Sequence, residues 1–123
     1  MRRRMRRRRR MAFTMIELLV VIVILGVLAA IALPRFADSK RKAYLAAMKS
    51  DLRNVVSAAE SHFAEDGTYA NWNGPTPTNQ ITLTFVGTLD GWVATASHAA
   101  VPGIVCRIER GPAAGAATEP VCQ

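Results

Sequence analysis

One carboxylate stands at the start of a long apolar run. Glu17 is followed by residues 18–33, in which no side chain is polar. A carboxylate in hydrocarbon costs about 2.5–3.5 kcal/mol even on translocon-insertion scales, so an ionisable group there needs a partner. We expect its own helix to supply none. We therefore interpret Glu17 as an acceptor for a group on another molecule.

The chain has two cysteines, Cys106 and Cys122, which enclose fifteen residues. Closing a loop of that size contributes about 3 kcal/mol in the chain-entropy account, and an oxidising compartment favours closure. Two free buried thiols are the alternative. No further ligand of a suitable type lies nearby, so we do not expect a zinc site.

Other residues of chemical interest lack the spacing that catalysis or metal binding requires. They are Ser57, Ser61, His62, Glu65, Asp66, Asp90 and His98. Neither histidine has a cysteine or paired carboxylates at ligand spacing, and we expect both to be exposed or half-buried. The serines lack a glycine elbow, and no phosphate-binding glycine loop is present. Calcium binding by the acidic residues is the alternative, but no ligand-dense loop supports it. We predict no catalytic residue, no cofactor, no metal and no enzymatic activity.

The basic residues are concentrated in an N-terminal arm. Arg2, Arg3, Arg4 and residues 6–10 supply eight of the sixteen basic side chains, so the net charge of +7 becomes −1 beyond Ala12. A basic block before an apolar run keeps the N-terminus in the cytoplasm. An arginine block can also neutralise nucleic-acid phosphates. The position of the arginine block beside a membrane span argues against nucleic-acid binding by the block. We do not expect the rest of the chain to bind nucleic acid either.

The apolar run is long enough to cross a membrane. Residues 13–33 span about 31 Å as a helix, which matches one bilayer. The apolar core of a cleavable secretory signal is shorter, roughly 7–15 residues. We predict a single-pass protein whose residues 13–34 cross the membrane and whose C-terminal part is exported.

The helical period continues after Pro34 in amphipathic form. One face is marked at steps of three and four by Tyr44, Met48, Leu52, Val55 or Val56, Ala59 and Phe63. This pattern predicts that residues 35–66 form an amphipathic helix, and Gly67 is a suitable stop. We expect one long helix from Phe13 to about Glu65, interrupted at Gly26 and Pro34, because glycine lowers helix propensity and proline removes a hydrogen bond.

The remainder, residues 67–123, predicts a loop, a small sheet and a tail. Three segments alternate with period two, which is typical of antiparallel strands with one buried face. The expected inward residues are Ile81, Leu83, Phe85, Trp92, Ala94, Ala96, Ile104, Cys106 and Ile108. A disulfide would tie the tail to the sheet. The fold class is therefore α+β, with a sheet of three to four strands packed on the amphipathic helix.

Residues 12–21, together with Gly26 and Pro34, resemble the N-terminal signature of type IV pilins and type II secretion pseudopilins. The helix, loop, sheet and cysteine pair agree with the ladle-shaped fold of that family. The resemblance implies that residues 1–12 are a leader, which a prepilin peptidase removes between Ala12 and Phe13, and that Phe13 is then N-methylated. Family leaders usually end in glycine, and this one ends in alanine.

The resemblance also implies a function. The chain would be a structural subunit of a type IV pilus-like filament, held in the inner membrane until an assembly platform polymerises it with copies of itself through the apolar helix. Glu17 of one subunit would meet the Phe13 amine of the next and set the stagger, and Gly26 and Pro34 would make the helix flexible. The alternatives are a type II secretion pseudopilin in the periplasm, or a minor tip pilin that binds DNA, a surface or a secreted protein. An ordinary membrane anchor, with an uncut arginine arm, is a third.

Overall fold

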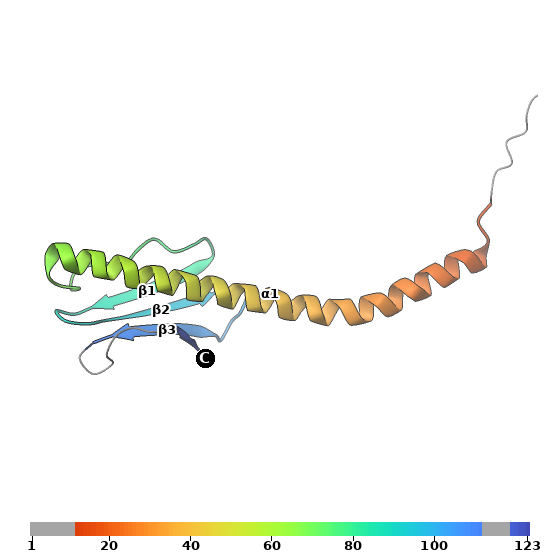
Figure 1. Ribbon diagram of the computed structural model, residues 1–123. Coiled ribbons are helices and arrows are strands. Elements are labelled where there is room, and N and C mark those ends of the chain that lie inside the picture. The colour runs from red at the N-terminus through yellow and green to blue at the C-terminus, as the bar shows by residue number, and fades with distance from the viewer. Residues whose placement is uncertain (1–11, 112–118) are drawn as a thin grey trace, which may run out of the picture. The chain divides into compact units, whose positions relative to one another are not determined.

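The computed structural model describes residues 12–111 and 119–123 (Figure 1). The expected leader, apart from Ala12, lies outside these residues. The chain divides into two units, one ending at Ala37 and the other comprising Asp38–Gln123. A single helix, α1 (Met15–Asp66), contributes residues to both. Each unit is described by itself below.

The first unit is the apolar half of α1. Its helix is long and apolar enough to cross a membrane, and none of its apolar window is buried within the protein. The expected interruptions are absent, because α1 is continuous through Gly26 and Pro34. Proline removes one backbone hydrogen bond, and strong helix formers on both sides of Pro34, such as Leu33 and Arg35, favour continuation of the helix.

The second unit packs the amphipathic half of α1 on an antiparallel sheet. The strands are β1 (Ile81–Gly87), β2 (Trp92–His98), β3 (Val105–Arg110) and β4 (Val121–Cys122). They lie in the order β1-β2-β3-β4, and every neighbouring pair is antiparallel. Two turns join the first three strands, as the Asp90-Gly91 and Pro102-Gly103 pairs predict. The α+β prediction is confirmed.

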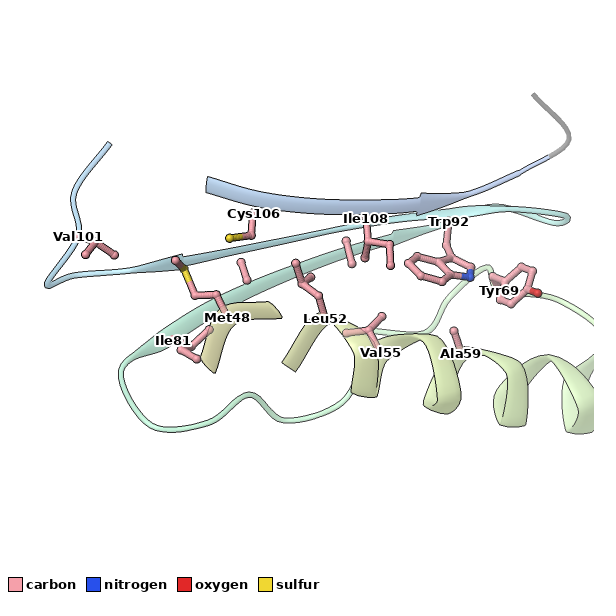
Figure 2. Packing of buried hydrophobic residues seen from close by; sticks show 12 residues of the cluster. Met48, Leu52, Val55, Ala59, Tyr69, Ile81, Trp92, Val101, Cys106 and Ile108 are labelled. Carbon is pink, nitrogen blue, oxygen red and sulfur yellow. The ribbon is translucent and has the colours of Figure 1, made fainter. Parts of the chain in front are cut away.

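The core lies between one face of α1 and one face of the sheet (Figure 2). Its buried apolar residues are Met48, Leu52, Val55, Ala59, Tyr69, Ile81, Trp92, Ala94, Ala96, Val101, Cys106 and Ile108. Burial of a large apolar side chain contributes about 1.5–3 kcal/mol. Small side chains at Ala94 and Ala96 in the central strand let the helix lie close to the sheet. This thin core therefore depends on α1 as its second layer.

Most of the predicted buried faces are correct, but the burial of Phe63 and of His98 differs from the prediction. Leu83 and Phe85 are only partly buried, as expected for an edge strand, and Phe63 is exposed although it stacks on Tyr69 at 4.6 Å between ring centroids. His98 was expected to be exposed or half-buried, but it is buried. Its ring stacks on Tyr44 at 4.4 Å, and its Nδ1 accepts a hydrogen bond from the Ala100 N–H.

Candidate assembly site

Glu17 has a partner within its own chain, contrary to expectation. Its Oε2 accepts hydrogen bonds from the Thr14 backbone N–H and from Thr14 Oγ1, each at 2.8 Å. The Glu17 backbone N–H in turn donates to Thr14 Oγ1 at 3.2 Å. This is a capping box, in which the residue before the helix and the residue three positions later satisfy each other's free groups. The Thr-x-x-Glu spacing was visible in the sequence.

The capping box fixes the carboxylate at the first turn of α1. The N-terminal end of a helix carries partial positive charge, so an acidic side chain there is stabilising. Ala12 and Phe13 precede the helix without regular structure and are exposed, with 84% of Phe13 accessible. Glu17 is therefore bonded to the amide that directly follows Phe13. Ala12 and Phe13, the expected cleavage site, thus directly precede the capping box that contains Glu17. Residues 1–11 lie outside the described part of the chain.

Beyond this cap, α1 exposes apolar side chains around its entire circumference. Every large apolar residue from Met15 to Leu33 is about half or more exposed. Gly26 lies in this surface, and apart from its chain neighbours and the nearby backbone of its own helix, no described group comes within 4 Å of the position that a Cβ would take there. A soluble monomer rarely exposes an apolar surface of this extent. The segment therefore requires a covering environment, from lipid or from other protein.

Cys106 and Cys122 form a disulfide, with 1.96 Å between the sulfur atoms. The two residues are register partners in β3 and β4, and Cys106 is fully buried. The chain ends beside the start of β3, because Val105 and Gln123 exchange both backbone hydrogen bonds. Arg53 on α1 pairs with Glu119 at 2.8 Å. The C-terminal residues are thus tied to both layers, and residues 112–118 lie outside the described chain.

The loop between α1 and β1 is anchored by a residue that sequence reasoning missed. Asp51 is 6% exposed, and its carboxylate accepts hydrogen bonds from the Thr78 backbone N–H and from Thr78 Oγ1, each at 2.7 Å. A buried carboxylate is tolerated when it is hydrogen-bonded in this way. The only signal in the sequence was an acidic residue beside the apolar face of a predicted helix.

The same loop also packs at the C-terminal end of α1. His62 stacks on Trp72 at 5.2 Å and contacts Asp66 Oδ2 through Nδ1 at 3.0 Å. Tyr69 donates from its hydroxyl to Glu60 Oε1 at 3.1 Å, and burial raises the pKa of Tyr69. Within the described residues, no group of three or more histidine, cysteine or acidic side chains is arranged to hold a metal ion.

Comparison with known proteins concerns mainly the N-terminal segment. The model of a family described as the prokaryotic N-terminal methylation motif matches residues 7–33. The chain is 37% identical over 60 residues to the type IV major pilin protein PilA of Myxococcus xanthus. The resemblance to the type IV pilins and type II secretion pseudopilins is confirmed. No solved structure matches the chain.

Other relatives come from both branches of the pilin and pseudopilin family. The chain is 46% identical over 55 residues to fimbrial protein EcpB of Eikenella corrodens and 34% identical over 65 residues to type II secretion system core protein G of Pseudomonas aeruginosa. These three matches cover 45–53% of this chain and 27–46% of the relatives. The chain thus matches less than half the length of each.

The N-terminal methylation motif covers most of the residues expected to form the assembly site. It includes Ala12 and Phe13, the Thr14–Glu17 capping box and Gly26, and it ends at Leu33, one residue before Pro34. The capping box and the exposed apolar part of α1 up to Leu33 therefore both lie within the segment that the family model matches.

Proposed function

We propose that the chain is a structural, non-enzymatic subunit of a type IV pilus-like filament. The observation that carries this is the apolar half of α1, exposed on all sides and capped at its first turn by a carboxylate. In the inner membrane, lipid would cover this surface. In a filament, the same surface of neighbouring subunits would cover it. The proposed orientation places the arginine arm in the cytoplasm and the head, residues 38–123, on the exported side.

The proposal includes processing before assembly. A prepilin peptidase would cleave between Ala12 and Phe13, and Phe13 would then be N-methylated. The methylation-motif match supports this step, and so does the exposure of both residues outside the helix. Cleavage would remove the arginine arm, whose charges otherwise hold the N-terminus in the cytoplasm. An inner-membrane platform would then move the subunit into the filament.

Glu17 would act at the contact between subunits. Cleavage creates an amine at Phe13, and in a stack of staggered helices this cation would meet the carboxylate of a neighbour. Desolvation offsets much of the attraction in a buried pair. The pair would therefore contribute mainly to register, since a subunit shifted by one turn would leave both charges unpaired. The capping box supports this role because it holds the carboxylate at a fixed position on α1.

A type II secretion pseudopilin is the second candidate, favoured by the similarity to core protein G. A minor tip pilin that binds DNA, a surface or a secreted protein is a variant of the leading proposal. In that variant, the binding surface would lie on the head.

Mass spectrometry of the N-terminal peptide tests these proposals. The peptide should begin at methylated Phe13 in both the membrane fraction and sheared extracellular fibres. The same peptide confined to the cell envelope would instead support a pseudopilin or a minor subunit. Intact arginine arms on all molecules would overturn the filament proposal.

A further inference from the structure

Most charged side chains on the sheet side of the head have partners within the chain. Arg53 pairs with Glu119, and Arg107 pairs with Glu109. Arg110 pairs with Glu60. Each of these pairs joins two opposite charges of the head. They contribute little to stability individually, because exposed pairs are worth about 0–1 kcal/mol, but they leave no net charge at these positions.

Among the charges without a partner in the described chain, Arg41 and Lys42 lie near one end of the head's part of α1 and Glu65 lies at the other, while Asp38 precedes the first group and Lys49 lies between the two. Within the described residues, Arg41 and Lys42 at one end and Glu65 at the other make no hydrogen bond or ion pair, and all three are exposed. Asp66, exposed and in contact with His62, adds a second negative charge beside Glu65. We call Arg41 and Lys42 the basic end, and Glu65 and Asp66 the acidic end.

The acidic residues at the end of α1 do not stabilise the helix. The C-terminal end of a helix carries partial negative charge, so acidic residues there are unfavourable and basic residues are favourable. The last turn of α1 contains Glu65 and Asp66 and no basic residue. The acidic end therefore makes the isolated helix less stable, and the charge of Glu65 remains available to a partner outside the chain.

The geometry of α1 identifies a suitable partner. Lys42 and Glu65 are 23 residues apart, which corresponds to about 34 Å along the axis and about 140° around it. The two charges therefore lie at opposite ends of the head helix and on nearly opposite sides. A head-to-tail contact between parallel copies joins two different surfaces of the same subunit. Opposite charges on opposite sides, separated along the axis, fit such a contact.

We propose that the basic end of one subunit contacts the acidic end of a parallel second copy, displaced by about 34 Å along the α1 axis. The inference rests on the proposed filament, since it requires parallel copies. It adds a contact between heads to the contact between apolar helices, and it uses complementary charge, which favours one register over others.

Charge exchange in the full-length chain tests this contact. Lys42→Glu and Glu65→Lys, each alone, should reduce the yield of sheared fibres about tenfold or more, because each places like charges together. The double variant Lys42→Glu/Glu65→Lys should restore most of the yield. Arg107→Glu, which changes the net charge as much as Lys42→Glu does, should leave the yield unchanged. Membrane levels of each subunit, and its disulfide, should match those of the wild type.

The outcomes separate this inference from the proposed function. If the wild-type chain forms fibres but the double variant stays as defective as either single variant, the contact does not exist, and a lipid or nucleic-acid partner for the basic end is favoured instead. An equal loss with Arg107→Glu would also overturn it, since net charge and not position would be the cause. Failure of the wild-type chain to form any fibre would overturn the filament proposal itself.

Discussion

Asp51 on α1 and Thr78 in the loop before β1 are joined by two hydrogen bonds of 2.7 Å, although they are 27 positions apart. Both bonds end on one buried carboxylate. Asp51 is 6% exposed, whereas Thr78 is exposed, so the two bonds chiefly satisfy the buried carboxylate. This single residue pair therefore fixes the loop, and with it the first strand, against the helix.

Replacement of Asp51 should destabilise the head. Asp51→Ala removes the acceptor of two hydrogen bonds, and each such bond contributes about 0.5–1.5 kcal/mol net, because water can replace the acceptor at the exposed Thr78. Asp51→Asn retains one acceptor oxygen and should lose less. The measurement is thermal unfolding of the detergent-solubilised full chain, followed by the fluorescence of buried Trp92. Thr78→Ser keeps both donors and is the control. An unchanged melting temperature in Asp51→Ala would contradict the anchoring role.

The disulfide should stabilise the same unit. Cys122→Ser removes a cross-link that closes fifteen residues, at a cost of about 3 kcal/mol in the chain-entropy account. Because Cys122 is only half-buried, serine introduces little new strain at that position. Reduction of the wild-type protein with dithiothreitol should lower the melting temperature by a similar amount. Reductant should have no effect on Cys122→Ser, and an equal effect on both proteins would refute the assignment.

Gly87 is required by a close backbone approach. A Cβ at this position would lie 1.9 Å from the carbonyl oxygen of Tyr69, whose N–H donates to the Thr88 carbonyl at 3.1 Å. Gly87→Ala must move the backbone of the loop or of β1, so we expect a loss of about 1–3 kcal/mol or more. Gly111→Ala is the matched control, since no described residue other than its chain neighbours lies within 4 Å of its Cβ position. Equal unfolding midpoints for the two variants in urea would contradict the prediction.

Alkaline pH should destabilise the head through Tyr69. Burial raises the pKa of Tyr69 above its usual value of 10.0, so the folded state favours the neutral phenol. Stability is therefore unaffected by this group below about pH 10 and falls as the pH rises through the higher folded pKa. Unfolding midpoints between pH 8 and pH 11 should show this fall. The Tyr69→Phe variant should show a smaller fall, and an identical pH profile would argue against Tyr69 as the cause.

Periodicity predicted the layers of this protein but not its polar contacts. Steps of three and four located the buried face of α1, and alternation located three strands, because burial itself has these periods. The same alternation places His98 on the inward face with Trp92, Ala94 and Ala96, so its burial was open to prediction. The contact between Asp51 and Thr78 was not, because it depends on the path of the loop of residues 67–80, which has no periodic pattern.

The N-terminal site was predicted in part. The apolar run and Glu17 identified the segment, and its relatives confirm the resemblance. Thr14, the intramolecular partner of Glu17, was missed because the prediction considered only partners on other molecules for a carboxylate in hydrocarbon. The Thr-x-x-Glu cap depends only on local sequence, and a search for helix start signals finds it.

Two substitutions of Glu17 separate the cap from the proposed contact between subunits. A capping box accepts glutamine in place of glutamate, so Glu17→Gln keeps an acceptor for Thr14 but carries no charge. Glu17→Ala removes both. If the charge of Glu17 binds the Phe13 amine of a neighbour, both variants should insert in the membrane at normal levels and both should yield few sheared fibres. If Glu17 serves only as a cap, Glu17→Gln should form fibres normally and only Glu17→Ala should be defective. Normal fibres from Glu17→Ala would exclude both roles in assembly.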